Sequence, residues 1–198
     1  MYSGDGGWNL IQLISFFIFW YLFGGILPAL YIGKRKGLDL RVEGSGNLGA
    51  RNAGRVLGKA MFFVVLLLDA TKGAVPIIVS RALGFSPAIV LLMLFAAVLG
   101  HCFPLFHRFR GGKGAASLLG GMIVFQPLIL LLILIFSGLL YSWIRQKTKA
   151  ALLGLSAIIP AIFIGYGQWA GIVAFCLFAL VIYTHRSYFI NEQGRQSV

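Results

Sequence analysis

The apolar stretch "PLILLLILIFSGLLYSWI", residues 127–144, decides the fold class, because it contains no charged side chain. A helix of ~20 mostly apolar residues can cross a bilayer, and a lipid-exposed backbone must satisfy its own hydrogen bonds. Comparable runs recur from residue 10 to residue 184. We therefore predict an all-α polytopic membrane protein with about seven transmembrane helices, at residues 9–32, 57–79, 86–106, 114–126, 127–144, 150–166 and 168–185.

The composition supports this class. Hydrophobic residues make up 59% of the chain and charged residues only 11%, whereas a soluble domain has about 25% charged residues. A β-barrel is disfavoured, because the apolar runs are continuous rather than alternating. We find no linker, low-complexity segment or convincing internal repeat, so residues 1–198 are predicted to form a single integral membrane domain.

The distribution of cations predicts the orientation. The net charge is +12, and with seven spans and an outside N-terminus, all Lys and Arg residues except Arg81 and Lys72 fall in cytoplasmic loops or the cytoplasmic C-terminal tail. Such loops obey the positive-inside rule. An anionic lipid or substrate is the second explanation for the charge, and the absence of a nucleic-acid-binding motif argues against nucleic acid.

Several kinds of site are disfavoured by the residues present. The first 33 residues carry Asp5 and no Lys or Arg, so we do not expect a signal peptide. Cys102 and Cys176 give neither a disulfide framework nor metal-ligand spacing. The five carboxylates form no close pair and no metal cluster. We therefore predict no metal and no cofactor, and the chain indicates no oligomeric state. The carboxylates are Asp5, Asp39, Glu43, Asp69 and Glu192.

The first predicted cytoplasmic loop, residues 39–58, reads "DLRVEGSGNLGARNAGRVLG". Its glycines are expected to interrupt any regular helix, and glycine lets backbone N–H groups approach an anion closely. The loop is a candidate phosphate-binding segment or, alone, an ordinary polar turn. Its candidate substrate-binding residues are Gly44, Ser45, Gly46, Asn47, Asn52 and Arg55.

The second predicted loop, "GHCFPLFHRFRGGKGAAS" at residues 100–117, repeats this chemistry on the same membrane face. It enters a predicted helix, whose first N–H groups can also bind an anion. Topology needs cations but no glycines, so two such loops favour an anionic ligand over a purely topological role. The candidate residues here are His101, Arg110, Gly111, Gly112, Lys113, Gly114 and Ser117.

Other polar residues in or beside the spans have two interpretations each. Asp69 and Lys72 are one turn apart inside a span, where ionisable residues are functional candidates, but such a pair can also neutralise itself. His101 and His185 lie at span ends. Each of these histidines could bind substrate or act as a general base, and each could instead have a packing role.

These segments resemble the acyl-phosphate-dependent glycerol-3-phosphate acyltransferases, the PlsY family, over about residues 24–186. The motif "GHCFPLFHRFRGGKGAAS" is similar to the family's second motif and is long enough to be specific. The other similar segments are "GSGNLGARN" (44–52), "LDATKG" (68–73) and "YTHR" (183–186).

The resemblance implies a bacterial inner-membrane enzyme with its active site on the cytoplasmic face. It would transfer an acyl group from acyl phosphate to the 1-hydroxyl of glycerol 3-phosphate, the first acylation step of bacterial phospholipid synthesis. Our hypothesis is that Ser45, Gly46 and Asn47, with Arg55, hold one phosphate, and that His185 orients the glycerol hydroxyls. Lys113 and the amides of Gly111, Gly112 and Gly114 would hold the other phosphate and stabilise charge on the reacting carbonyl. We therefore expect catalytic roles for Lys113, His185, Asn47 and Ser45.

Two departures from the family pattern keep other functions open. Arg51 stands where the first motif usually has Thr, and Tyr188 stands where the third motif usually has Asn. One alternative is therefore a diverged homologue that binds phosphorylated lipids without acyl transfer, or that uses another acceptor. A small anion transporter is a further alternative. The position of the polar motifs disfavours it, because they lie at one membrane face rather than at mid-bilayer.

Overall fold

The computed structural model describes residues 7–186, and every regular element in this range is helical. The longer helices are α1 (Leu10–Gly24), α4 (Lys59–Ala82), α5 (Pro87–Cys102), α6 (Ala115–Phe125), α7 (Pro127–Ile144) and α10 (Gln168–Thr184). The shorter ones are α2 (Pro28–Arg35), α3 (Ala50–Leu57), α8 (Lys147–Gly154) and α9 (Ile158–Tyr166), with 3₁₀ turns at Leu105–His107 and Leu155–Ala157.

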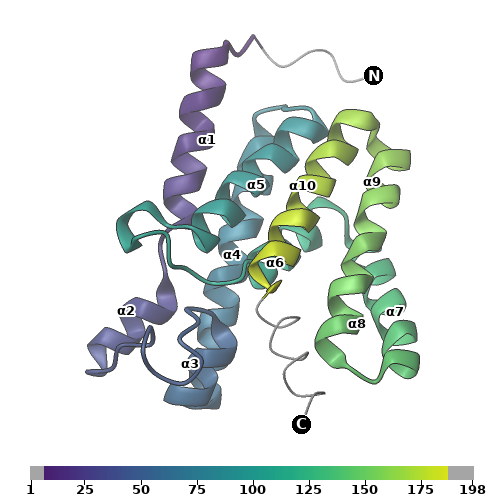
Figure 1. Cartoon of the computed structure of the whole chain (residues 1–198). Coiled ribbons are helices and arrows are strands. Elements are labelled where there is room, and N and C mark those ends of the chain that lie inside the picture. Colours follow the sequence, from purple (N-terminus) through teal and green to yellow (C-terminus); the bar gives the residue numbers. More distant parts are fainter. Residues whose placement is uncertain (1–6, 187–198) are drawn as a thin grey trace.

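The helices form a bundle with α1 at one edge and the hairpin of α7, α8 and α9 at the other (Figure 1). Helices α4, α5, α6 and α10 lie between these edges, and the largest buried apolar cluster joins α5, α6, α9 and α10. Helices α2 and α3 sit beneath α1 and α4 at one end of the bundle. The apolar segments alternate in direction along the chain. The ends of α1, α5 and α10 and the starts of α4 and α6 therefore all point toward that end.

The apolar segments occupy the places predicted from the sequence. By length and composition, five are long enough to cross a membrane: Leu10–Arg35, Lys59–Ala82, Pro87–His107, Pro127–Ile144 and Lys147–Tyr166. The other two, Ala115–Phe125 and Gln168–Thr184, are shorter apolar helices. The all-helical class is confirmed, and the number of crossings and their orientation stay predictions.

The predicted span at 9–32 is two helices rather than one. Helix α1 ends at Gly24, and α2 begins at Pro28 after a short non-helical linker. A proline is accepted in the first turn of a helix but not in its interior, because it lacks an N–H donor. The break frees the carbonyl groups of Gly24 and Ile26, which accept hydrogen bonds from the buried ammonium group of Lys72.

The expectation that glycines prevent a regular helix in the first loop is wrong for its second half, where α3 forms. Gly49 caps α3 in an extended conformation, and Gly54 lies within it. A Cβ atom at Gly54 would be 2.7 Å from Cβ of Phe62 in α4. Glycine at this position therefore lets α3 pack closely against α4, which offsets its low helix propensity.

Small residues bring two pairs of helices unusually close. A Cβ atom at Gly73 of α4 would meet the carbonyl oxygen of Ser117 in α6 at 1.7 Å, and one at Gly120 would meet that of Ala70 at 2.1 Å. Likewise, a Cβ atom at Gly100 of α5 would lie 1.9 Å from the carbonyl oxygen of Tyr21 in α1. Such small-residue contacts are typical of helix packing in membranes. They fix α6 against α4 and α5 against α1, and so position the loops at the ends of these helices.

Candidate functional site

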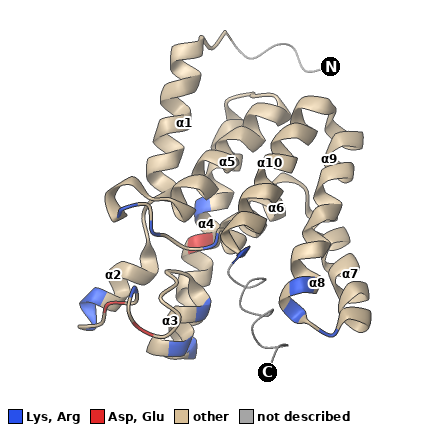
Figure 2. Ribbon diagram, in the orientation of Figure 1, with Lys and Arg blue, Asp and Glu red and all other residues tan. Residues whose placement is uncertain are grey.

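Cations gather toward the end of the bundle where the two glycine-rich loops lie (Figure 2). Arg81 is at the opposite end, where its guanidinium donates to the carbonyl groups of Val124 and Phe125 and lies over the Phe125 ring. Most Lys and Arg residues of the described chain therefore lie toward the end with the loops. We expect an anion-binding site at this end of the bundle.

The second loop folds back onto the end of α5. The amide of Gly111 donates to the carbonyl of Cys102 at 3.2 Å, and the amide of Gly112 donates to that of His101 at 3.0 Å. These two N–H groups are therefore already hydrogen-bonded. Their donors shape the loop in this structure, and a contact of these two residues with a substrate phosphate stays a prediction.

The glycines of this loop are required by close contacts. A Cβ atom at Gly111 would lie 2.0 Å from the carbonyl oxygen of His101, and one at Gly112 would lie 2.1 Å from Nε2 of the same residue. Gly114 has a φ of 79° and caps α6, against Sγ of Cys102 and a methyl group of Val98. The three glycines hold the loop against α5 and leave the intervening Lys113 side chain partly exposed.

The end of α10 is tied to the same loop. The hydroxyl of Thr184 donates to the carbonyl of Lys113 at 2.9 Å, and the same hydroxyl lies 2.9 Å from the carbonyl of Val181. His185 follows directly and is buried. The structure therefore brings the predicted catalytic residues Lys113 and His185, which are far apart in sequence, to one place.

Arg51 joins this pair electrostatically. Partial burial lowers the pKa of the Lys113 ammonium below its ordinary value, and the positive charge of Arg51 lowers it further. Arg51 is exposed in the first turn of α3. The site thus contains two cations from different loops, an arrangement that favours a ligand with more than one negative charge.

The His185 imidazole is held in one tautomer. Its Nδ1 lies 2.8 Å from the carbonyl oxygen of Val181, and because a carbonyl can only accept, Nδ1 carries the proton. Burial lowers the pKa of His185, and although the bond to Val181 raises it, the charges of Lys113 and Arg51 lower it again. The ring is therefore neutral at pH 7, with its Nε2 lone pair able to accept a hydrogen bond.

Asn52 organises the first loop from inside. Its side-chain oxygen accepts from the amide of Ser45 at 2.7 Å, and its NH₂ group donates to the carbonyl groups of Leu40 and Glu43 at 3.2 and 3.0 Å. The side chain is buried. The donors and the acceptor of Asn52 hold the loop together, and its expected contact with substrate stays a prediction.

The turn around Gly44, Ser45 and Gly46 is shaped by Asn52 and by backbone bonds. Gly44 and Gly46 have φ angles of 62° and 69°, a left-handed conformation that favours glycine. The Gly46 amide donates to the carbonyl of Glu43, so the amides of Ser45 and Gly46 are both occupied. The Ser45 side chain is exposed and Asn47 is partly exposed, and both remain candidates for ligand contact.

Four further predicted residues lie away from Lys113 or are buried. Ser117 is fully buried where α6 meets α4, and His101 is buried beneath Gly112. Both side chains are packed in the protein interior, and their expected contact with substrate stays a prediction. Arg110 and Arg55 are exposed, and within the described chain no contact places either beside Lys113.

Two residues in this site were missed as site residues by the sequence reasoning. The signal for Arg51 was its departure from the family motif, which could have pointed to a role in the site. Thr184 lies in the quoted segment "YTHR". Tyr188, the other departure, lies outside the described residues. The described site therefore stops at Arg186.

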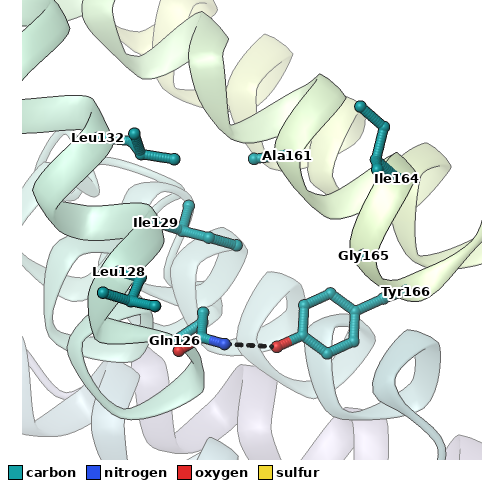
Figure 3. A pocket seen from close by; sticks show the side chains of 8 residues that line it. All are labelled: Gln126, Leu128, Ile129, Leu132, Ala161, Ile164, Gly165 and Tyr166. Atoms are coloured by element: carbon teal, nitrogen blue, oxygen red, sulfur yellow. Dashed lines mark hydrogen bonds between the residues drawn. The ribbon is translucent and has the colours of Figure 1, made fainter.

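An apolar groove lies between α7 and α9, at the opposite end of the bundle from the loops (Figure 3). Its volume is about 430 Å³. The groove is lined by Gln126, Leu128, Ile129, Leu132, Ala161, Ile164, Gly165 and Tyr166. The side-chain amide of Gln126 donates to the Tyr166 hydroxyl at 3.1 Å at one end of it. This groove contains none of the predicted site residues.

The profile of the glycerol-3-phosphate acyltransferase family matches residues 14–191. Glycerol-3-phosphate acyltransferase 1 of Bacillus cereus is 38% identical over 168 residues, which cover 84% of this chain and 92% of the relative. The glycerol-3-phosphate acyltransferase of Aquifex aeolicus is 37% identical over 172 residues, which cover 85% of this chain and 89% of the relative.

Solved structures agree with this match. The crystal structure of PlsY, an integral membrane glycerol 3-phosphate acyltransferase, in its glycerol 3-phosphate form superposes with a TM-score of 0.81 at 33% identity, covering 92% of each chain. The lysophosphatidic acid form of PlsY gives a TM-score of 0.79 at 31% identity with the same coverage. The range matched by the family profile, residues 14–191, includes both glycine-rich loops. This chain therefore belongs to the glycerol-3-phosphate acyltransferase family.

Proposed function

We propose that the protein transfers a fatty acyl group from acyl phosphate to the 1-hydroxyl of glycerol 3-phosphate, producing lysophosphatidic acid and inorganic phosphate. Family membership supports the acyltransferase activity and glycerol 3-phosphate as the acceptor. The observation that carries the proposal in this molecule is the assembly of Lys113, Arg51 and His185 at one end of the bundle. The two cations suit the two phosphate groups of the substrates.

The donor and acceptor have different needs. Acyl phosphate is a mixed anhydride and is already activated, so transfer requires no coenzyme A and no covalent enzyme intermediate. In this proposal, Lys113 neutralises one phosphate and the charge that develops on the reacting carbonyl. Arg51 and the side chains of Ser45 and Asn47 hold the other phosphate. Binding both substrates side by side supplies much of the rate through proximity.

The bond changes are balanced within the two substrates. The glycerol oxygen forms an ester bond to the acyl carbon, and the bond between that carbon and the phosphate oxygen breaks. The hydroxyl proton leaves to Nε2 of His185 or to an oxygen of the departing phosphate. The proposal does not use His101 as the base, because its buried ring is bonded to Lys72. His185 orients the hydroxyl in either case.

The proposed location is the bacterial inner membrane, with the site on the cytoplasmic face. Two observations support it: the apolar helices, and the gathering of Lys and Arg at the end of the bundle that carries the loops. Glycerol 3-phosphate is water-soluble and would reach Arg51 and Lys113 from that side. The acyl chain would remain in the lipid.

The test is phosphate release by the purified protein given palmitoyl phosphate and glycerol 3-phosphate, with detection of lysophosphatidic acid. Release that depends on glycerol 3-phosphate, and that is lost in Lys113→Ala at equal protein level, is the expected result. Arg108→Ala is the matched control, because Arg108 is an exposed cation of the same loop. Turnover unchanged in Lys113→Ala would contradict the assignment of Lys113.

The presence of Arg51 in the site and of Tyr188 in the tail favours one second candidate. In it, the protein binds phosphorylated lipids without transferring the acyl group, or uses another acceptor. Glycerol 3-phosphate binding to folded protein, together with only spontaneous hydrolysis of palmitoyl phosphate, would identify this case. A screen of other polyol phosphates as acceptors would follow.

A further inference from the structure

A buried charged cluster lies beneath the two loops. The Nζ atom of Lys72 is 2.7 Å from the carbonyl oxygen of Ile26, 2.8 Å from Nδ1 of His101, 3.0 Å from Oδ1 of Asp69 and 3.2 Å from the carbonyl oxygen of Gly24. Asp69, Lys72 and His101 are each at most 4% exposed as whole residues. One ammonium group thus joins α4 to α5 and to the linker between α1 and α2.

Neutralising a charge explains only part of this cluster. Asp69 alone would neutralise Lys72 through their ion pair within α4. The two shortest contacts of Lys72 are instead to Ile26 and His101, which belong to other segments. An ammonium with three donors directed at other helices acts as a tie between them.

The segments that Lys72 joins are the anchor points of the two loops. Ile26 lies just before α2, which leads into the loop of Ser45 and Asn47. His101 lies near the end of α5, which leads into the loop of Gly112 and Lys113. A displacement of either anchor relative to Lys72 would therefore move one loop relative to the other.

The cluster also fixes the tautomer of His101. The Lys72 ammonium has three N–H donors and no acceptor, and its three hydrogen-bond partners are the carbonyl groups of Gly24 and Ile26 and Nδ1 of His101. Nδ1 of His101 must therefore accept. The His101 proton is consequently on Nε2, on the side of the ring that faces Gly112. The His101 carbonyl accepts from the Gly112 amide at 3.0 Å, so both its ring and its backbone support the loop of Lys113.

We infer that Lys72 is a positioning residue, which together with Asp69 and His101 holds the two substrate-binding loops in register across α4. The catalytic effect of this tie rests on the proposed function. The structural tie between the two loops does not depend on that function. Loss of the tie would leave each loop able to bind its own phosphate, while the two substrates would no longer meet in the reactive arrangement.

The test variant is the double substitution Asp69→Leu with Lys72→Met. Removing Lys72 alone would leave an unpaired buried carboxylate, which is strongly destabilising, whereas replacing both members of a buried pair with apolar residues is often tolerated. Ser80→Ala is the control, because Ser80 is also buried in α4 but lies near its other end. Glycerol 3-phosphate binding stoichiometry measures the folded fraction of each variant.

The kinetic expectation is a loss in kcat on the order of 10–100-fold with KM for both substrates within about twofold, since small misplacements of reacting groups have effects of this size. The binding stoichiometry is expected to stay at the wild-type value. A kcat within about twofold of wild type would overturn the inference. So would a loss of kcat that only follows a loss of binding sites, because that indicates unfolding.

Hydrogen–deuterium exchange separates this inference from the proposed function. We expect faster exchange in both residues 25–58 and residues 103–114 of the double variant, and unchanged exchange in residues 147–166. Unchanged exchange in either loop would overturn the inference, as would faster exchange throughout the chain. Absence of turnover in the wild-type protein would refute the proposed function, and the exchange result would still decide on the tie.

Two single variants identify which ring nitrogen of His101 matters. His101→Asn keeps an acceptor near the position of Nδ1, and His101→Gln places a polar group near that of Nε2. We expect the kcat of His101→Asn to be at least about tenfold higher than the kcat of His101→Gln. The reverse order would show that His101 acts through Nε2 and would overturn its role as a partner of Lys72.

Discussion

His185 combines three features that define its chemistry: burial, a proton fixed on Nδ1 and two nearby cations. Burial and the neighbouring charges both disfavour the imidazolium form, so the pKa lies below the ordinary value of about 6.5. The neutral ring is therefore the form that the proposed function requires. Protonation of Nε2 would remove the acceptor that we propose for the substrate hydroxyl.

The pH dependence of activity follows from this state. We expect kcat/KM to be flat between about pH 7 and pH 8 and to fall only as the pH drops below about 6.5, where the imidazole gains a proton. His185→Gln should lower kcat by on the order of 100-fold and abolish this acid limb. The measurement is a pH profile of kcat/KM for both proteins. An acid limb that persists in the variant would assign the titration to another group, such as a substrate phosphate.

Gly112 has a strict steric requirement. Gly112→Ala would place Cβ 2.1 Å from Nε2 of His101, whose ring is held by Lys72. We expect a loss of stability of ~1–3 kcal/mol from overpacking, with a lowered unfolding temperature in detergent and reduced turnover. Gly138→Ala in α7 is the matched control, because nothing lies within 4 Å of a Cβ there. Equal unfolding temperatures for the two variants would contradict the steric argument.

At the scale of elements, the end of α10 is connected to the second loop by one hydroxyl. Thr184→Val keeps the shape of the side chain but removes its donor to the carbonyl of Lys113. The expected result is a loss of about 1 kcal/mol of stability and a several-fold loss of kcat, because Lys113 and His185 are no longer held together.

Unfolding temperature and steady-state kinetics of Thr184→Val measure this effect. Ser142→Ala is the control, because the Ser142 hydroxyl makes a local bond within α7, to the carbonyl of Leu139, away from the site. If both variants behaved like the wild-type protein, the bond of Thr184 to the loop would have no functional weight.

Hydropathy located the apolar helices but not their breaks. The span at 127–144 was predicted with the bounds that α7 has, because length and absence of charge suffice for such a segment. The interruption between Gly24 and Pro28 was missed, since apolar composition continues through it. Helix α3 was missed because the propensity of glycine is unfavourable, and only packing against Phe62 shows why Gly54 is suitable there.

The site was predictable in residue type and not in side-chain direction. Lys113 and His185 could be named from the motifs. The sequence could not show that the side chain of Asn52 points into its own loop or that Ser117 faces α4, because both depend on contacts between distant segments. Arg51 entered the site for the same reason, since α3 carries it toward Lys113.

At the scale of the whole molecule, the described loops that carry cations lie toward one end of the bundle, and the α4–α5 turn lies at the other. We therefore expect a cysteine at Lys147 to react with a membrane-impermeant maleimide only from the cytoplasmic side. A cysteine at Leu83, which is 40% exposed, should react only from the outside. The background for both is Cys102→Ala with Cys176→Ala.

Labelling of intact cells and of inverted vesicles measures this orientation. Reaction of both cysteines from the same side would contradict the alternating arrangement of the helices. Reaction of each from the opposite side to that expected would invert the orientation while retaining the fold.

The placement of Lys113, Arg51 and His185 at one end of the bundle has a consequence for the growth of the bilayer. With the proposed site at that end, the product enters only the leaflet that the site faces, so every turnover adds lipid to one side of the membrane. Expansion of the opposite leaflet then depends on a separate movement of lipid across the bilayer. Because the protein is asymmetric, other proteins must keep the areas of the two leaflets equal.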